Sequence, residues 1–229
     1  MDRKAVLLDA GGVLIVPDIA RLVSALVVLG HQPVDCDPAR VHFEAVAAMD
    51  HDPHQLEPTT AYWQALMDLL GIELTPPVTE AVLQLARDPD YWAVPVGDVH
   101  RHLKAIADAF PVVGVVSNSD GTIEQVLRDA RICQVGTGPG VEVDVIIDST
   151  VHGVAKPDPA VFGMALDAVG VQPSETIYVG DSVRLDVQSA NAAGIHPVHC
   201  DPYHLCPIDG HDHVAGLVGL LNGDRPEAG

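Results

Sequence analysis

The stretch Ala5–Gly12 reads AVLLDAGG: a short apolar run that ends in Asp9 and is followed by two glycines. Such a run is typical of a β-strand covered on both faces. The glycines permit a tight turn and the close approach of a ligand. Because open α/β sheets bind ligands at the carboxyl ends of their strands, Asp9 lies where a nucleophile or metal ligand is needed. An isolated aspartate at a strand end also serves as an ordinary turn or helix cap.

Four later segments repeat this pattern of a short apolar run before a turn and a helical stretch. They are Val112 to Val116, Val143 to Ile147, Thr176 to Val179 and Ile195 to His199. Strands that alternate with helices predict a parallel sheet with helices on both faces. The predicted fold class is therefore α/β, with a doubly wound parallel sheet.

A long region between the first two strands, about residues 16–91, lacks a convincing strand and contains several helical stretches. Pro17 and Asp18 open it, and Asp88-Pro89-Asp90 closes it, because proline stops helices and stiffens hinges. We predict a helical domain at 17–91, inserted into a core made of 1–16 and 92–229.

The composition limits the classes of partner. The formal charge is -20 with only 12 Lys and Arg, so nucleic acid and an anionic membrane surface would be repelled. The longest apolar stretch, Ile19 to Leu29, is broken by polar residues and is shorter than the roughly 20 residues of a membrane span. The 4 cysteines form no CxxC pair, which argues against a disulfide framework. We expect a cytoplasmic protein, and a monomer or a homodimer suits the composition equally.

Two further polar segments follow predicted strands. Ser117-Asn118-Ser119-Asp120 offers a hydroxyl, an amide and backbone N–H groups to an anion at a helix start, although the same residues also cap helices. Lys156 precedes Pro157-Asp158-Pro159, and it could hold an anionic nucleophile and a substrate oxyanion together. A lone lysine otherwise faces solvent.

Two acids, Asp181 and Asp186, lie at the end of the fourth predicted strand and in the turn beyond it. Read alone, they are a capping residue and a surface acid. Together with Asp9 and a backbone carbonyl they would supply the oxygen ligands that Mg²⁺ prefers.

These four segments, in this order, resemble the four motifs of the haloacid dehalogenase-like superfamily, and the resemblance spans the chain. Asp9 matches the nucleophile, Ser117 the hydroxyl of the second motif, Lys156 the lysine of the third, and Asp181 with Asp186 the acids of the fourth. The helical insert looks like the C1 cap of subfamily I. The resemblance implies a Rossmann-like core with a helical cap that closes over the active site.

The resemblance also implies an activity. We expect a Mg²⁺-dependent, phosphatase-type hydrolase that acts on a small, phosphorylated molecule through an aspartyl intermediate at Asp9. Asp9, Asp181, Asp186 and the Gly11 carbonyl would hold the metal. The expected substrate ligands are Ser117, Asn118 and Lys156, with Arg40 of the insert as a further candidate.

One residue departs from the phosphatase pattern. Phosphatase members carry a second Asp two residues after the nucleophile as general acid and base, and here that position is Gly11. Its loss costs roughly 10²- to 10⁴-fold in rate, most for alkyl phosphates with poor leaving groups.

Two alternatives therefore stay open. Metal-independent 2-haloacid dehalogenases use a cap arginine, for which Arg21 and Arg40 are candidates, although Asp181 preserves the metal-binding form of the fourth motif. A non-catalytic binding protein of the same fold is the other. Phosphonate-cleaving members are excluded because they need a cap lysine, and no lysine occurs between Ala5 and Leu103.

Histidines and cysteines are concentrated near the carboxyl end. They are His196, His199, Cys200, His204, Cys206, His211 and His213. Such side chains bind zinc, but their spacings fit no standard site. We favour a loop beside the active-site mouth whose histidines adjust the charge near neutral pH.

Overall fold

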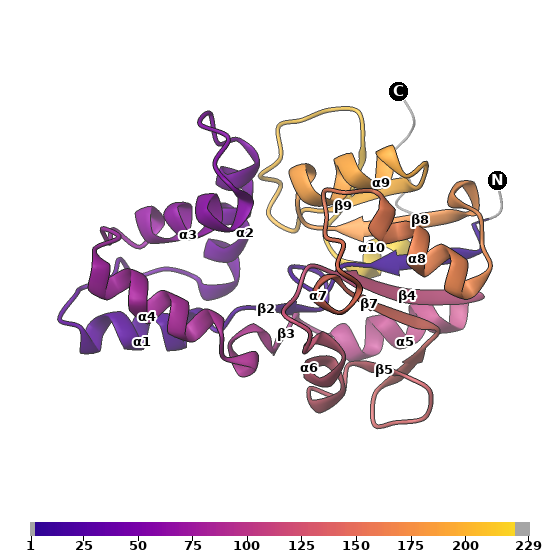
Figure 1. The fold of residues 1–229 in the computed structure, drawn as a ribbon, viewed down its shortest axis with the longest axis horizontal. Coiled ribbons are helices and arrows are strands. Elements are labelled where there is room, and N and C mark those ends of the chain that lie inside the picture. The colour runs from indigo at the N-terminus through magenta and orange to yellow at the C-terminus, as the bar shows by residue number, and fades with distance from the viewer. Residues whose placement is uncertain (1–2, 223–229) are drawn as a thin grey trace.

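The central sheet contains all five strands expected from the sequence. In the computed structural model, which describes residues 3–222, six strands are ordered β10-β9-β8-β1-β4-β7, and every neighbouring pair is parallel (Figure 1). The strands are β1 (Ala5–Leu8), β4 (Val112–Ser117), β7 (Val145–Asp148), β8 (Thr176–Gly180), β9 (His196–Cys200) and β10 (Asp212–Val214). The predicted doubly wound α/β fold is confirmed.

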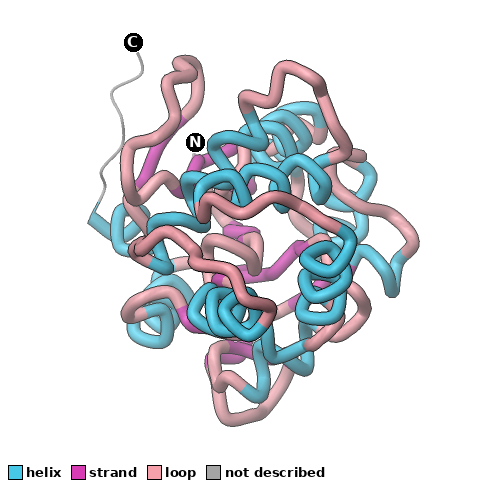
Figure 2. Tube along the Cα trace, turned by 90° about the vertical axis from the view of Figure 1, so that its left-hand side faces the viewer, coloured by secondary structure: helices cyan, strands magenta, loops and turns pink. Residues whose placement is uncertain are grey.

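Alternate residues of β1 supply two hydrophobic cores, one on each face of the sheet. Val6 and Leu8 join the cluster with α5 (Val99–Ala109) and α6 (Ile123–Asp129). Leu7, which points the other way, joins the cluster with α8 (Ala160–Val169). The remaining core helices are α7 (Ser149–His152), α9 (Gln188–Ala192) and α10 (Leu217–Asn222), with short turns at η2 (Pro173–Glu175) and η3 (Val183–Val187). Figure 2 shows the helices surrounding the central strands.

Four helices form the insert beside the core in Figure 1: α1 (Ile19–Val28), α2 (Pro38–Asp50), α3 (Pro58–Leu69) and α4 (Pro76–Ala86). The last three begin with proline at the first helical position, where its missing N–H costs nothing. The insert has its own hydrophobic cluster, with buried members from Ile19 to Tyr91. This separate cluster supports the proposed cap at 17–91.

Several short strands were not predicted. The antiparallel pair β2 (Ile15–Val16) and β3 (Val94–Pro95) joins the insert to the core, next to a single turn at η1 (Pro89–Trp92). β5 (Cys133–Val135) and β6 (Val141–Val143) form a small sheet, so the expected strand from Val143 is divided into β6 and β7. Within residues 3–222, no helix has the length and apolar character needed to cross a membrane.

Candidate active site

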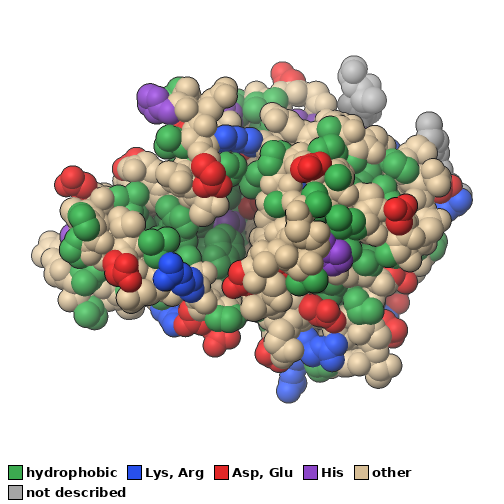
Figure 3. Space-filling model, in the orientation of Figure 1, with side chains coloured by type: hydrophobic (Ala, Val, Ile, Leu, Met, Phe, Trp, Pro, Cys, Tyr) green, Lys and Arg blue, Asp and Glu red, His purple; other side chains and the backbone are tan. Residues whose placement is uncertain are grey.

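The sheet brings the predicted site residues together at one edge. β1 lies between β4 and β8, so Asp9, Ser117 and Asp181 follow neighbouring strands at their carboxyl ends. Lys156 enters from the loop before α8, and Asp186 lies in η3. All five of these residues are buried. This edge also faces the insert, and Figure 3 shows the surface hollowed between the two parts.

Lys156 is the centre of the charge network. Its Nζ lies 2.8 Å from Asp9 Oδ2 and 2.7 Å from Asp186 Oδ1, and it donates to the Tyr178 hydroxyl at 2.8 Å. Burial alone would lower the pKa of Lys156, but attraction to Asp186 and Asp9 outweighs it and raises the pKa. The lysine is therefore a permanent buried cation at neutral pH.

Asn118 positions that lysine. Its side-chain Nδ2 donates to the Lys156 carbonyl at 2.8 Å, and its Oδ1 accepts from the Lys156 N–H at 2.8 Å. Both amide atoms are thus engaged with the loop that carries Lys156. Ser117 Oγ has no hydrogen-bond partner among residues 3–222 and is free to bind a ligand oxygen.

Three carboxylates share this buried space. One oxygen each from Asp9, Asp181 and Asp186 lie within 4.8 Å of one another. Burial, only partly offset by Lys156, raises the pKa of Asp9 to about 7. Burial and the neighbouring Asp186 raise the pKa of Asp181 to about 8. Three acids against one lysine leave an excess of negative charge that protons or a bound cation must neutralise.

The donor set fits Mg²⁺, which takes oxygen ligands. The backbone at Gly12 passes against the Asp181 carboxylate so closely that a Cβ there would lie 1.9 Å from Oδ2. Gly12 also has φ +66°, which favours glycine. The second glycine of the opening motif is therefore required for the carboxylates to converge.

Helix α2 of the insert contacts the site through two residues that the sequence analysis missed. His42 Nε2 lies 3.3 Å from Asp181 Oδ2, while its Nδ1 bonds to the Tyr62 hydroxyl at 2.9 Å. Burial lowers the pKa of His42 to about 3, so the ring is neutral. Among the described residues, Nε2 has no hydrogen-bond partner.

Asp50, the last residue of α2, fixes the insert to the fourth motif. It accepts hydrogen bonds from Ser182 Oγ at 2.7 Å and from the N–H groups of Val183 at 2.6 Å and Arg184 at 3.0 Å. Nothing in the helical pattern distinguished His42 or Asp50 from the other polar residues of α2, because their roles depend on how the insert packs.

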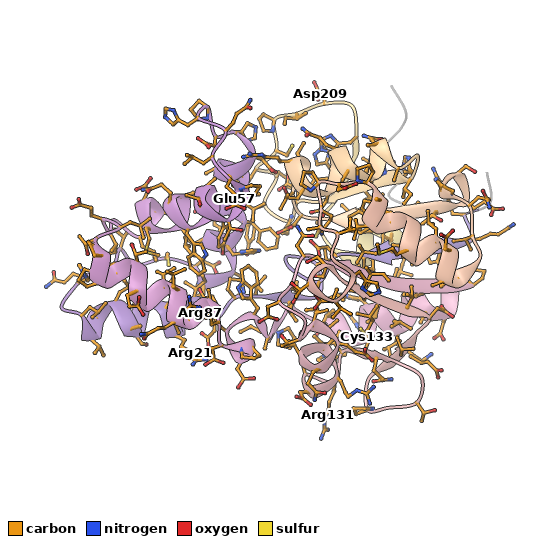
Figure 4. The ribbon with its side chains drawn as sticks, in the orientation of Figure 1. Arg21, Glu57, Arg87, Arg131, Cys133 and Asp209 are labelled. Atoms are coloured by element: carbon orange, nitrogen blue, oxygen red, sulfur yellow. The ribbon has the colours of Figure 1, made fainter. Side chains whose placement is uncertain are left out.

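The two cap arginines considered as substrate ligands, Arg21 and Arg40, lie outside this network. Arg40 pairs with Glu44 at 2.7 Å and lies over the Tyr203 ring, and its side chain is half-exposed. Arg21 pairs with Asp88 on the insert surface, at the lower edge of the cap in Figure 4. Neither is in contact with the carboxylates, so the structure gives no support to Arg40 as a substrate ligand.

Gly11 leaves a gap that an apolar side chain borders. A Cβ at this position would meet the Trp92 ring at 3.7 Å, an ordinary contact distance. Trp92 and His42 are themselves edge-to-face neighbours, with ring centroids 5.7 Å apart. Gly11 itself offers no proton-transfer group at the position where the phosphatase pattern has a second aspartate.

A doubly wound α/β core thus gathers an aspartate, a lysine and two further acids at the carboxyl edge of its sheet. The family model for haloacid dehalogenase-like hydrolases matches residues 3–194. The chain belongs to that family.

The chain is similar to curated proteins by sequence and to solved structures by fold. The haloacid dehalogenase-like hydrolase domain-containing protein 3 of Danio rerio is 36% identical over 107 residues, 47% of this chain and 41% of the relative. The phosphoserine phosphatase of Thermus thermophilus is 42% identical over 67 residues, 29% of this chain and 27% of the relative. The chain thus spans less than half the length of either relative. A dehalogenase crystal structure with an intermediate superposes with a TM-score of 0.59 at 17% identity, covering 97% of each chain, which shows the fold alone.

Proposed function

We propose that the protein is a Mg²⁺-dependent, phosphatase-type hydrolase of a small phosphorylated molecule. The observation that carries this proposal is the charge imbalance of the site, where three buried carboxylates face a single lysine. A metal-independent dehalogenase would have no use for this excess of acid. We further propose a cytoplasmic location for the enzyme, as a monomer or a homodimer.

Asp9 is the proposed nucleophile. One of its oxygens attacks phosphorus, the bond to the leaving oxygen breaks, and water then hydrolyses the aspartyl phosphate. Lys156, 2.8 Å from Asp9 Oδ2, holds the carboxylate in place and offsets its charge. Ser117 Oγ and the backbone N–H groups near Asn118 bind the phosphoryl oxygens. The metal, held by Asp9, Asp181, Asp186 and the Gly11 carbonyl, would supply charge neutralisation at the phosphoryl group.

Substrate preference follows from Gly11. No side chain at this position can protonate the leaving oxygen, so the leaving group has to depart unaided or take its proton from water or from the substrate. Aryl and acyl phosphates, whose leaving groups are weak bases, are therefore the preferred substrates.

Initial rates on aryl, acyl and alkyl phosphates and on 2-haloacids, with Mg²⁺ and with chelator, test the proposal. We expect Mg²⁺-dependent turnover of aryl and acyl phosphates that Asp9→Asn abolishes. Asp108→Asn is the matched control, because Asp108 is exposed on α5 and pairs only with Lys104. Halide release that survives the chelator would establish a dehalogenase instead, and no turnover of any substrate would favour a binding protein.

A further inference from the structure

The carboxyl-terminal part of the core gathers a second group of metal-binding side chains, away from the three carboxylates. Ligand atoms of His199, Cys206, His211 and His213 all lie within 4.8 Å of one another. His199 on β9 and His213 on β10 are direct partners in the parallel ladder. Cys206 and His211 come from the loop that joins these two strands.

Two of the ligand–ligand distances are close to the edges of a tetrahedral site. His199 Nδ1 lies 3.2 Å from His211 Nε2, and Cys206 Sγ lies 3.8 Å from the same nitrogen. For Zn–N of about 2.0–2.1 Å and Zn–S of about 2.3 Å, tetrahedral geometry gives about 3.3 Å between nitrogens and about 3.6 Å between nitrogen and sulfur. His213 Nε2 is buried and has no hydrogen-bond partner within residues 3–222.

A hydrogen bond to the backbone of Asp181, which is not one of the four clustered residues, sets the tautomer of His199. Its Nε2 lies 3.0 Å from the Asp181 carbonyl, which can only accept, so Nε2 carries the proton. Nδ1 therefore presents a lone pair to the cluster. A ligand histidine whose other nitrogen donates to a carbonyl is the usual arrangement at protein metal sites.

Cys206 is also held in position. Asp201 accepts hydrogen bonds from the N–H groups of Leu205 at 2.9 Å and Cys206 at 3.0 Å, which fixes the start of the loop. The loop thus brings one sulfur and one imidazole next to the two imidazoles of β9 and β10.

We propose that His199, Cys206, His211 and His213 bind one Zn²⁺ in a closed tetrahedral site. One thiolate and three imidazoles suit Zn²⁺ and are unsuited to Mg²⁺, which prefers oxygen. With four protein ligands no position is left for substrate, so the ion is structural. It joins the loop around Asp209, labelled at its outer end in Figure 4, to β9 and β10.

This site is chemically separate from the carboxylate site but mechanically connected to it. His199 binds zinc through Nδ1 and donates to the Asp181 carbonyl through Nε2. Zinc therefore helps to hold the backbone of a residue in the proposed Mg²⁺ site.

The test is metal analysis of the untagged full-length protein, because a polyhistidine tag would bind zinc itself. We expect one tightly bound zinc per chain after dialysis, and a thiolate-to-cobalt charge-transfer band when Co²⁺ replaces it. Cys206→Ser should abolish that band and weaken zinc binding by at least about tenfold. His204→Ala, in the same loop but outside the cluster, is the matched control and should change neither.

Two further variants make the test decisive. Asp181→Asn should retain zinc, because the ion is not in the carboxylate site, and His213→Ala should lose it while keeping the circular dichroism of the folded protein. The proposal is overturned if the wild type takes up no zinc from buffered solution. It is equally overturned if Cys206→Ser binds zinc and gives the cobalt band as the wild type does, or if Asp181→Asn alone releases the ion.

Discussion

The residue at position 11 determines whether the site has a general acid for the leaving group. Gly11 lies two residues after the proposed nucleophile, and the space beside it is bordered by Trp92 rather than by an acid. The backbone of Gly11 does not have the positive φ that would exclude a side chain. Position 11 can therefore accept a Cβ without a close contact or backbone strain.

We predict that Gly11→Asp increases activity toward alkyl phosphates by about 10²- to 10⁴-fold, because it supplies a general acid to a poor leaving group. Acyl phosphates, which need no such help, should change little. Initial rates of the wild type and of Gly11→Asp on one alkyl phosphate and one acyl phosphate measure the difference between the two gains. Gly11→Asn is the control of equal size, and an equal gain in that variant would show that proton transfer is not the cause.

Lys156 is the residue on which the buried charges depend. Lys156→Met keeps the length of the side chain but leaves Asp9 and Asp186 without their cation. We predict a loss of about 3–5 kcal/mol in the free energy of unfolding without Mg²⁺, with part of it recovered when Mg²⁺ is added. Urea unfolding without and with Mg²⁺ measures the loss in the free energy of unfolding and its partial recovery. Lys104→Met, which breaks only an exposed pair with Asp108, should cost less than about 1 kcal/mol; a similar loss in both variants would contradict the prediction.

At the scale of the elements, strands and helices differed in how well the sequence predicted their roles. The central strands were predictable because strands buried on both faces are continuous apolar runs. β10 was not, because Asp212–Val214 is polar at the sheet edge. The helices of the insert were expected, but the contacts of α2 with the fourth motif were not, since they arise between segments more than 130 residues apart.

Asp50 tests whether those contacts hold the cap in place. Asp50→Ala removes the acceptor for three hydrogen bonds from residues 182–184 and leaves their donors to water. We predict a KM increase of about tenfold, equivalent to about 1.4 kcal/mol, and faster proteolysis of the links at residues 15–18 and 88–95. Glu44→Gln, on the exposed side of α2, is the control. An unchanged KM with unchanged proteolysis would show that the cap is held by other contacts.

At the scale of the whole molecule, the four motifs could be assembled from sequence because each follows its own strand of one sheet. Asp9, Ser117, Lys156, Asp181 and Asp186 meet as predicted, since parallel strands place their carboxyl ends at one edge. Arg40 pairs with Glu44 on the cap. Its placement could not be predicted, because a cap helix can present a given side chain to the core or to solvent and sequence alone does not fix which. The histidine and cysteine cluster was underrated because its ligands are brought together by strand pairing, not by local spacing.

The buried acids also make stability depend on pH and on metal. In the metal-free protein, the pKa values of Asp9 and Asp181 are raised from 3.8 to about 7 and about 8, so the folded state holds protons that the unfolded state has released. Stability from these groups is therefore lost as pH rises through this range, by about 1.4 kcal/mol per pH unit for each extra proton. His42 acts in the opposite sense: its pKa is lowered, so its contribution is lost as pH falls below about 6.5.

Mg²⁺ competes with the protons on these acids, so we predict that its stabilising effect grows between about pH 6 and pH 9 and then levels off. The measurement is the difference in Tm with and without Mg²⁺ across this range. The contribution of His42 below about pH 6.5 is common to both conditions and cancels in that difference. Asp181→Asn should flatten the dependence, whereas Asp108→Asn, on the surface of α5, should not. An increase in Tm that is the same at every pH would mean that Mg²⁺ binds away from the carboxylates, because only at this site must bound protons be released first.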